Sequence, residues 1–516
     1  MGKTKPMFYN ALLLTGVNLL LRFVSTSFQV YLSGQIGAAG IGLLQLVLSV
    51  GALAVTAGMG GIRTATMYLC AEVVGQKRSE RMGWVLSGCV VYSLVLSSAV
   101  AAALYSFAPQ IASGWVGDRR TTDAIRLLAC ILPVNCLCGV LVGHFTGINR
   151  IGTLAAVEVA EQFFSMGMTV LLLRLWAGND PSRACQAVIM GSGLGACFTL
   201  TVLLLLKRTD PQGGRQRFGL KKKLLETAVP LAIADDVKAG ISTTENLMVP
   251  KRLALYPGST SPLAAFGMVC GMVFPVLMFP AAILFGLAEL LIPELARCRA
   301  AGCFVRIRHL SERSFLLALV YGCLCGGILF LKADRLCLAL YKTEQAGMYL
   351  QWFALLAPML YCDAIVDAMV KGLGQQKICV RYNIITSAMD VVLLFVLLPK
   401  YGMQGYFSSF LITHLINFVL SIRLLVKLVG PVARAKAVLG ALLAALCGTV
   451  AGLLLPEIWQ VPGFCGVCGA MLMLLGVVKR EDLLWLKGLM TCKSCSPPQS
   501  ASADSSSPGR SLGRGG

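Results

Sequence analysis

The sequence predicts an all-α polytopic membrane protein, and three observations carry this prediction. Of the 516 residues, 57% are hydrophobic and only 13% are charged, whereas soluble domains carry about 25% charged residues. The mean hydropathy is +0.76. Apolar runs recur along most of the chain, and helices can span a bilayer because they satisfy their own backbone hydrogen bonds in hydrocarbon. Although the chain is basic, we therefore expect it to be surrounded by membrane lipids and to bind no nucleic acid.

The helices can be placed along the chain in order. A spanning helix requires about 20 predominantly apolar residues, and the sequence contains about fourteen such runs. We expect the spans at residues 8–32, 37–59, 82–107, 124–146, 153–177, 184–206, 224–249, 262–292, 312–331, 347–370, 380–399, 402–425, 435–455 and 462–478. The basic segment 1–6 leads into a first span that is too long for a signal peptide, so it should stay as a helix.

The positive residues favour this topology. If the N-terminus is cytoplasmic, alternating sides place 32 Lys and Arg residues on the cytoplasmic side and ten on the other, with Arg22, Arg126 and Lys238 inside helices. Cytoplasmic connections of membrane proteins carry such an excess of positive charge. The pattern predicts a multi-pass membrane protein with both termini in the cytoplasm.

The longest internal polar connection, residues 207–223, divides the first twelve helices into two sets of six. Gly147-x-x-Arg150 follows the fourth span and Gly374-x-x-Lys377 follows the tenth, which favours two parallel repeats. Chance also explains so short an echo. We expect a first lobe at 1–214, a second lobe at 215–430, two further helices at 431–480 and a disordered cytoplasmic tail at 481–516.

The first helix carries a polar stripe. Asn18, Arg22, Ser25 and Gln29 fall within about 60° of one another on a helix. A charge inside a span is costly, so it usually faces a water-filled cavity or a partner. We predict a cavity wall that binds an anionic substrate group. The alternative is that Arg22 pairs with a carboxylate of a neighbouring helix and only holds the bundle together.

The seventh helix carries four ionisable residues, Asp235, Asp236, Lys238 and Glu245. Asp235, Lys238 and Glu245 share an arc of about 80°, so this face should avoid lipid. The acidic residues could bind a coupling H⁺ or Na⁺, and Lys238 could assist Arg22 in the substrate cavity. An internal salt bridge between Asp235 and Lys238, at i and i+3, explains the pattern equally well.

No catalytic constellation is present, and no cofactor is expected. The sequence contains no phosphate-binding Walker loop and no G-x-S-x-G, which disfavours an ATP-driven pump and a hydrolase. Cys465-x-x-Cys468 has metal-ligand spacing, but it lies in an apolar helix and no histidine joins it. We therefore predict neither an enzyme nor a metal site. Prolines 275, 280 and 293 should kink the eighth span, which would suit a moving part.

Several motifs, in this order, resemble the polysaccharide flippases of the multidrug, oligosaccharidyl-lipid and polysaccharide exporter (MOP) superfamily. The motifs are residues 36–45 after a first helix with mid-span Arg22, residues 61–75, Val249-Pro-Lys-Arg-Leu253, residues 267–294, Gly372-Leu-Gly374, and 398–402 with 405–406. The resemblance covers most of residues 8–478.

This resemblance implies two six-helix lobes around a central cavity that opens alternately to each side of the bacterial plasma membrane. It implies a lipid-linked oligosaccharide or lipid II as cargo, Arg22 as a cavity cation, and a lipid-tail groove at the last two helices. The second and eighth spans contain no Lys or Arg at the positions where the lipid II flippases carry further cations. Two other functions stay open: a drug or cation antiporter of the same superfamily, and a scaffold that recruits wall-synthesis enzymes.

Overall fold

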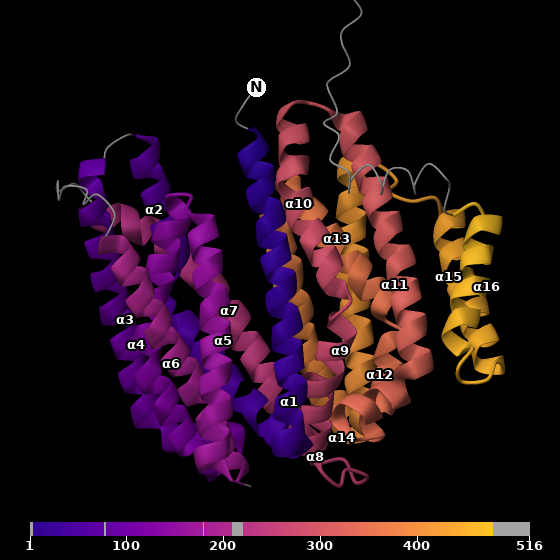
Figure 1. Ribbon diagram of the computed structural model, residues 1–516, viewed down its shortest axis with the longest axis horizontal. Helices are drawn as coiled ribbons and strands as arrows, with labels where there is room; N and C mark the ends of the chain where they lie inside the picture. The colour runs from indigo at the N-terminus through magenta and orange to yellow at the C-terminus, as the bar shows by residue number, and fades with distance from the viewer. Residues whose placement is uncertain (1–3, 77–78, 179, 209–219, 478–516) are drawn as a thin grey trace, which may run out of the picture.

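The computed structural model describes residues 4–76, 79–178, 180–208 and 220–477, and every regular element within them is a helix. The helices run side by side as a bundle, with α15 and α16 at one edge (Figure 1). The all-α membrane fold expected from the sequence is confirmed at this level. The expected tail at 481–516 lies outside the described residues.

The helices of the first half are α1 (Thr4–Met59), α2 (Ile62–Gly75), η1 (Ser79–Arg81), α3 (Met82–Gln110), η2 (Ile111–Val116), η3 (Arg119–Thr121), α4 (Thr122–Gly147), α5 (Ile151–Leu172), η4 (Leu173–Ala177) and α6 (Pro181–Arg208). Those of the second half are α7 (Leu220–Leu253), α8 (Pro262–Met268), η5 (Val269–Val273), α9 (Phe274–Met278), α10 (Ala281–Ala300), α11 (Phe304–Tyr341), α12 (Gln345–Ala354), α13 (Ala357–Gly372), α14 (Gln376–Val429), α15 (Ala435–Leu454) and α16 (Gln460–Leu474).

Eight helices in the described residues are long and apolar enough to cross a membrane, or up to ten if each bent pair is one span. Two long helices, α1 and α14, each contain a glycine with non-helical backbone angles, Gly37 (φ 68°) and Gly402 (φ 59°). Glycine tolerates positive φ because it lacks a Cβ. Each long helix therefore consists of two arms that meet at this glycine. The count of fourteen spans and the division into lobes remain predictions.

Some predicted boundaries require correction. Residues 62–75, expected in a polar connection, form α2, so Arg63 lies on a helix that follows the second span. The eighth predicted span is bent by 63° between α9 and α10, where its prolines predicted a kink, and the tenth is bent by 54° between α12 and α13. The fourteenth, expected at 462–478, is a helix of 15 residues. Apolar length alone does not reveal the bend of the tenth span, because packing decides it.

Prolines account for the irregular segment from α8 to α10. Proline has no N–H, so Pro275 cannot donate to the carbonyl of Gly271. Gln29 of α1 supplies this donor, with Nε2 3.2 Å from the Gly271 oxygen. Three tyrosine hydroxyls of α11 and α13 donate to further carbonyls of the segment, those of Met272, Leu277 and Pro280, at 3.2, 2.6 and 2.9 Å. The kinked span is thus held by neighbouring helices.

The shortest of these tyrosine bonds gives a stability prediction. Tyr361 is 1% exposed and donates to Leu277. Tyr361→Phe leaves that buried carbonyl without this donor, so we expect a loss of about 1 kcal/mol of stability. Thermal unfolding in detergent measures the effect. Tyr68→Phe, at a tyrosine that is 56% exposed, is the matched control and should unfold like the wild type. Equal unfolding of the two variants would contradict the role given to Tyr361.

A close backbone approach between the two halves of the sequence joins α1 and α8 through glycines. A Cβ added to Gly42 would lie 2.3 Å from the Leu263 carbonyl oxygen, and one added to Gly267 would lie 2.1 Å from the Ala38 carbonyl oxygen. Only glycine permits such backbone contact. This contact lies at the end of the bundle opposite the chain's N-terminus (Figure 1). A hydrogen bond also joins the two halves of the sequence, because Lys251 of α7 donates to the Gly114 carbonyl of η2.

The last two helices dock against α11 through a charged clamp. Arg335 of α11 pairs with Glu457 between α15 and α16 at 2.5 Å, and Lys332 donates to the Glu457 carbonyl at 2.7 Å. The outward faces of α15 and α16 remain apolar and exposed, as at Leu446 and Leu454. Such faces are expected in contact with lipid tails.

Candidate functional site: a cavity between α1 and α10

A cavity of about 570 Å³ lies between α1 and the segment from α9 to α10. Its lining combines apolar, polar and charged side chains: Leu19, Leu21, Arg22, Ser25, Thr26, Gln29, Gln45, Pro275, Ala282, Phe285, Gly286 and Glu289. Both arms of α1 contribute, since Gln45 follows the turn at Gly37. Three residues of the polar stripe predicted for the first helix, Arg22, Ser25 and Gln29, therefore line this cavity.

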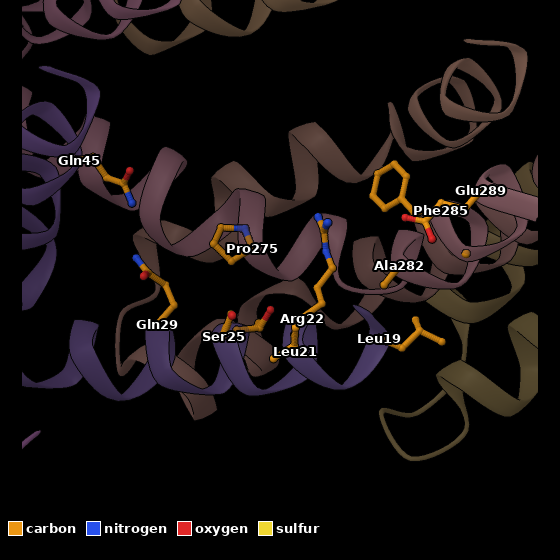
Figure 2. Close-up of a pocket in the computed structure, with 12 residues that line it drawn as sticks. Leu19, Leu21, Arg22, Ser25, Gln29, Gln45, Pro275, Ala282, Phe285 and Glu289 are labelled. Atoms are coloured by element: carbon orange, nitrogen blue, oxygen red, sulfur yellow. The ribbon is translucent and has the colours of Figure 1, made fainter. Parts of the chain in front are cut away.

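Arg22 is the one Lys or Arg among the described residues that line this cavity. Its side chain extends from α1 across the cavity toward the helices that carry Pro275 and Phe285 (Figure 2). The guanidinium lies 4.9 Å from the centre of the Phe285 ring, a distance typical of a cation–π contact. The ring holds the guanidinium while its N–H groups stay available to an anionic ligand.

The other stripe residues have different roles. Ser25 lines the cavity beside Arg22, one helical turn further along α1 (Figure 2). Gln29 also lines it, but its amide is engaged with the Gly271 carbonyl. Asn18 is on α1, while its side chain lies outside the described part of the chain. Its predicted role stays a prediction.

The charges of α7 lie elsewhere. Lys238, predicted to assist Arg22, is not among the lining residues, and neither are Asp235 and Asp236. Asp235 and Lys238 are both exposed, and Asp236 carries a buried carboxylate oxygen for which the described residues offer no hydrogen-bond partner. Lys238, the cation predicted to share the substrate site with Arg22, therefore does not line the cavity that contains Arg22.

Glu245 lines a second cavity, of about 170 Å³, between α7, α13 and α14. The lining residues are Glu245, Asp363, Asn383, Thr386, Ser387, Asp390, Thr413, His414 and Asn417. Asp390 accepts hydrogen bonds from Ser409 at 2.6 Å and from Thr413 at 3.2 Å. Three carboxylates therefore line one small polar cavity.

The remaining polar groups of this second cavity are only partly bonded. Asn417 donates to Asp363 at 3.2 Å, while the other Asp363 oxygen has no hydrogen-bond partner among the described residues. His414 lies 3.0 Å from the Phe410 carbonyl through Nδ1 and stacks on the Phe410 ring. Acidic groups with spare acceptor capacity suit a small cation or a proton.

One functional candidate escaped the sequence analysis. Glu289 faces the first cavity. The signal for Glu289 was present, because it is a carboxylate inside a predicted apolar span. Its proximity to Arg22, however, depends on how α10 rotates against α1, which local sequence does not reveal. Within the described residues, no group of three or more His, Cys, Asp and Glu is arranged to hold a metal ion.

Comparisons with known proteins agree with this architecture. Residues 14–161 match the MatE family model. The chain is 22% identical over 409 residues to stage V sporulation protein B of Bacillus subtilis (strain 168), covering 76% of this chain and 78% of that protein. The solved structure of lipid II flippase MurJ in an inward closed conformation matches with a TM-score of 0.66 at 13% identity, covering 92% of this chain and 100% of that one.

A second solved structure, an inward-facing multidrug resistance MATE family transporter of the MOP superfamily, matches with a TM-score of 0.63 at 13% identity. The match covers 80% of this chain and 98% of the chain in that structure. The apolar helices and this fold together indicate a multi-pass membrane protein. The resemblance expected from the sequence is confirmed, and the fold is similar to that of solved MOP-superfamily structures.

Proposed function

We propose that this chain is a flippase that moves a lipid-linked saccharide, such as a peptidoglycan precursor, across the plasma membrane by alternating access. Spore cortex or cell wall synthesis would use such a cargo. The observation that carries the proposal is the position of Arg22, a permanent cation inside a cavity of about 570 Å³ with polar walls. The similarity to stage V sporulation protein B and to the fold of MurJ supports it.

The cavity suits the physical problem of flipping. A lipid-linked saccharide needs a hydrated path for its head group while its tail stays in hydrocarbon. Arg22 would offset the charge of the phosphate groups, and Ser25, Thr26 and Gln45 would hydrogen-bond to sugar hydroxyls. With both termini in the cytoplasm, as the positive-inside distribution predicts, the α1–α8 glycine contact would lie on the outer side. This structure would then be the state that is closed to the outside.

The second cavity suits energy coupling. Glu245, Asp363 and Asp390 would bind H⁺ or Na⁺ there, apart from the cargo. Because α7 carries Glu245 and also contacts α1, with Thr243 donating to the Ser49 carbonyl at 3.0 Å, a change at Glu245 can reach the helix that forms the cargo cavity. Asp235 and Asp236, predicted to act with Glu245, do not line this cavity.

Reconstitution tests the proposed function. The full chain in proteoliposomes should move a fluorescent polyprenyl-diphosphate-linked disaccharide to the other leaflet, and the same lipid class should copurify with it. Vesicles that flip no faster than protein-free vesicles would overturn the proposal and favour the scaffold. Export of a cationic dye without any flipping would instead favour a drug antiporter.

The coupling site gives a further prediction. Glu245→Gln removes one carboxylate from the second cavity while leaving the Arg22 cavity untouched, so we expect gradient-driven flipping to fall roughly tenfold, equivalent to about 1.4 kcal/mol. Flipping is measured with imposed H⁺ and Na⁺ gradients in turn, which identifies the ion. Glu344→Gln, at an exposed carboxylate before α12, is the control. A Glu245→Gln variant that responds fully to both gradients would remove Glu245 from the coupling site.

A further inference from the structure

The end of α14 and the start of α15 carry positive charges and no negative charge. This basic cluster consists of Arg423, Lys427, Arg434 and Lys436. The sequence contains no Asp or Glu between Asp390 and Glu457, so no carboxylate nearby in the chain offsets the cluster. The connection is short, since α14 ends at Val429 and α15 begins at Ala435. Four like charges are therefore held within a short stretch of chain.

The side chains of the basic cluster are available to a ligand. All four residues are exposed, and in the part of the chain that the structure describes none of their side chains makes an ion pair or a hydrogen bond. Two arginines at the start of α11 differ in this respect, because Arg306 pairs with Glu294 at 2.7 Å and Arg308 pairs with Glu312 at 2.9 Å. Like charges held together repel one another, so the cluster requires a counterion from outside the chain.

Apolar side chains lie beside the basic cluster. Leu439, Leu442 and Leu443 follow it on α15 and are exposed, as is Val426 of α14, which precedes Lys427. Exposed apolar faces of membrane helices contact acyl chains, whereas Lys and Arg near helix ends extend to the level of the lipid head groups. The cluster is therefore placed where a phospholipid has its phosphate, with apolar helix surface available to the acyl chains.

The two ends of the α15–α16 pair differ in how they are held. At the end of the α15–α16 loop, Arg335 of α11 pairs with Glu457. The α14–α15 connection lies at the opposite end, toward the chain's N-terminus (Figure 1). There the described residues offer the basic cluster no carboxylate partner. Clusters of four or more Lys and Arg directly beside a membrane helix are typical of sites for anionic lipid head groups.

We propose that the basic cluster binds the head group of an anionic phospholipid of the surrounding bilayer, whose acyl chains lie along the exposed face of α15. The lipid phosphate supplies the negative charge that the chain lacks here and connects the end of α14 to the start of α15. This inference goes beyond the proposed function, because the phospholipid is retained at the edge of the bundle and is not moved through the Arg22 cavity.

Native mass spectrometry of the full chain in detergent tests the inference, with phosphatidylglycerol and phosphatidylcholine of identical acyl chains as probes. The wild type should bind phosphatidylglycerol roughly 30-fold more tightly, equivalent to about 2 kcal/mol, because each basic residue near the head groups adds to the attraction. Replacing all four residues of the basic cluster by glutamine should bring this ratio close to one. The matched control replaces Arg306 and Arg308, which already have carboxylate partners, and should keep the wild-type ratio.

Equal binding of the two lipids by the wild type, or an unchanged ratio in the four-residue variant, would overturn the inference. So would displacement of the lipid by an equal concentration of inorganic phosphate, because the cluster would then be a simple anion site. Loss of the preference in Arg22→Ala would also overturn it, since the lipid would then occupy the cargo cavity.

Thermal unfolding without added lipid checks that each variant is folded. If the four-residue variant does not fold, Arg434→Gln with Lys436→Gln replaces it, and this pair should lower the ratio to roughly fivefold. An unchanged ratio in the folded pair would again contradict the inference. None of these measurements involves flipping, so failure of the flippase proposal and failure of this inference are distinguishable.

Discussion

Arg22→Ala should reduce flipping of a lipid-linked saccharide roughly 10- to 100-fold. A hydrogen bond between charged partners contributes about 1.5–3 kcal/mol, and the described lining offers no second cation to replace it. Arg22→Lys should retain part of the activity, because lysine keeps the charge but loses the planar, bidentate geometry. The measurement is the initial flipping rate in proteoliposomes at a matched protein density.

The control for Arg22→Ala is Arg126→Ala. Arg126 also lies within a membrane helix and over an aromatic ring, 5.4 Å from the centre of Tyr105, but it does not line the cavity. Removing either cation–π contact costs about 0.5–1 kcal/mol at an exposed site, so the two variants should unfold alike and differ in flipping. Wild-type rates in Arg22→Ala would reject Arg22 as the cargo-binding cation.

Gly267→Ala should prevent α1 and α8 from closing one end of the transporter. The new Cβ would lie 2.1 Å from the Ala38 carbonyl oxygen and 2.6 Å from the Gly42 nitrogen, both backbone atoms that cannot rotate away. Overpacking of this kind costs about 1–3 kcal/mol, which corresponds to a population shift of roughly 5- to 150-fold. We expect the state described here to be depleted and flipping to fall by a similar factor.

Spin labels on non-natural amino acids at residues 113 and 260 would report this change. Both positions lie near the end that the α1–α8 contact closes, since Lys251 bridges to Gly114 there. Pulsed electron resonance should show longer label-to-label distances in Gly267→Ala than in the wild type. Gly240→Ala is the matched control, because a Cβ there meets nothing within 4 Å. Identical distance distributions in all three proteins would exclude the glycine contact as a gate.

The sequence predicted the features that depend on solvent preference. A chain with apolar runs of spanning length and few charges can only be stable as membrane helices. Arg22 could be chosen from the sequence alone, because a permanent charge in mid-span must face water or a partner. Its stripe with Ser25 and Gln29 follows from the period of one helix, and both of those residues do line the cavity.

The sequence was less informative where helices meet one another. It placed Lys238 with Arg22, because both are cations inside predicted spans, and it grouped Glu245 with Asp235, because those two share a face of one helix. The structure instead assigns Glu245 to a cavity with Asp363 and Asp390. Two residues on one face can lie several turns apart along the membrane normal and therefore meet different neighbours.

By itself, then, the sequence determined the solvent, the class of fold and Arg22 as a cation that had to be accounted for. Only the tertiary structure brought Glu289 to the same cavity as Arg22, assigned Gln29 to the carbonyl freed by Pro275, and set Gly267 against the backbone of α1. The physical reason is that hydropathy and helical period act within one segment. Contacts between segments depend on the rotation, tilt and kinks that packing imposes on all of them together.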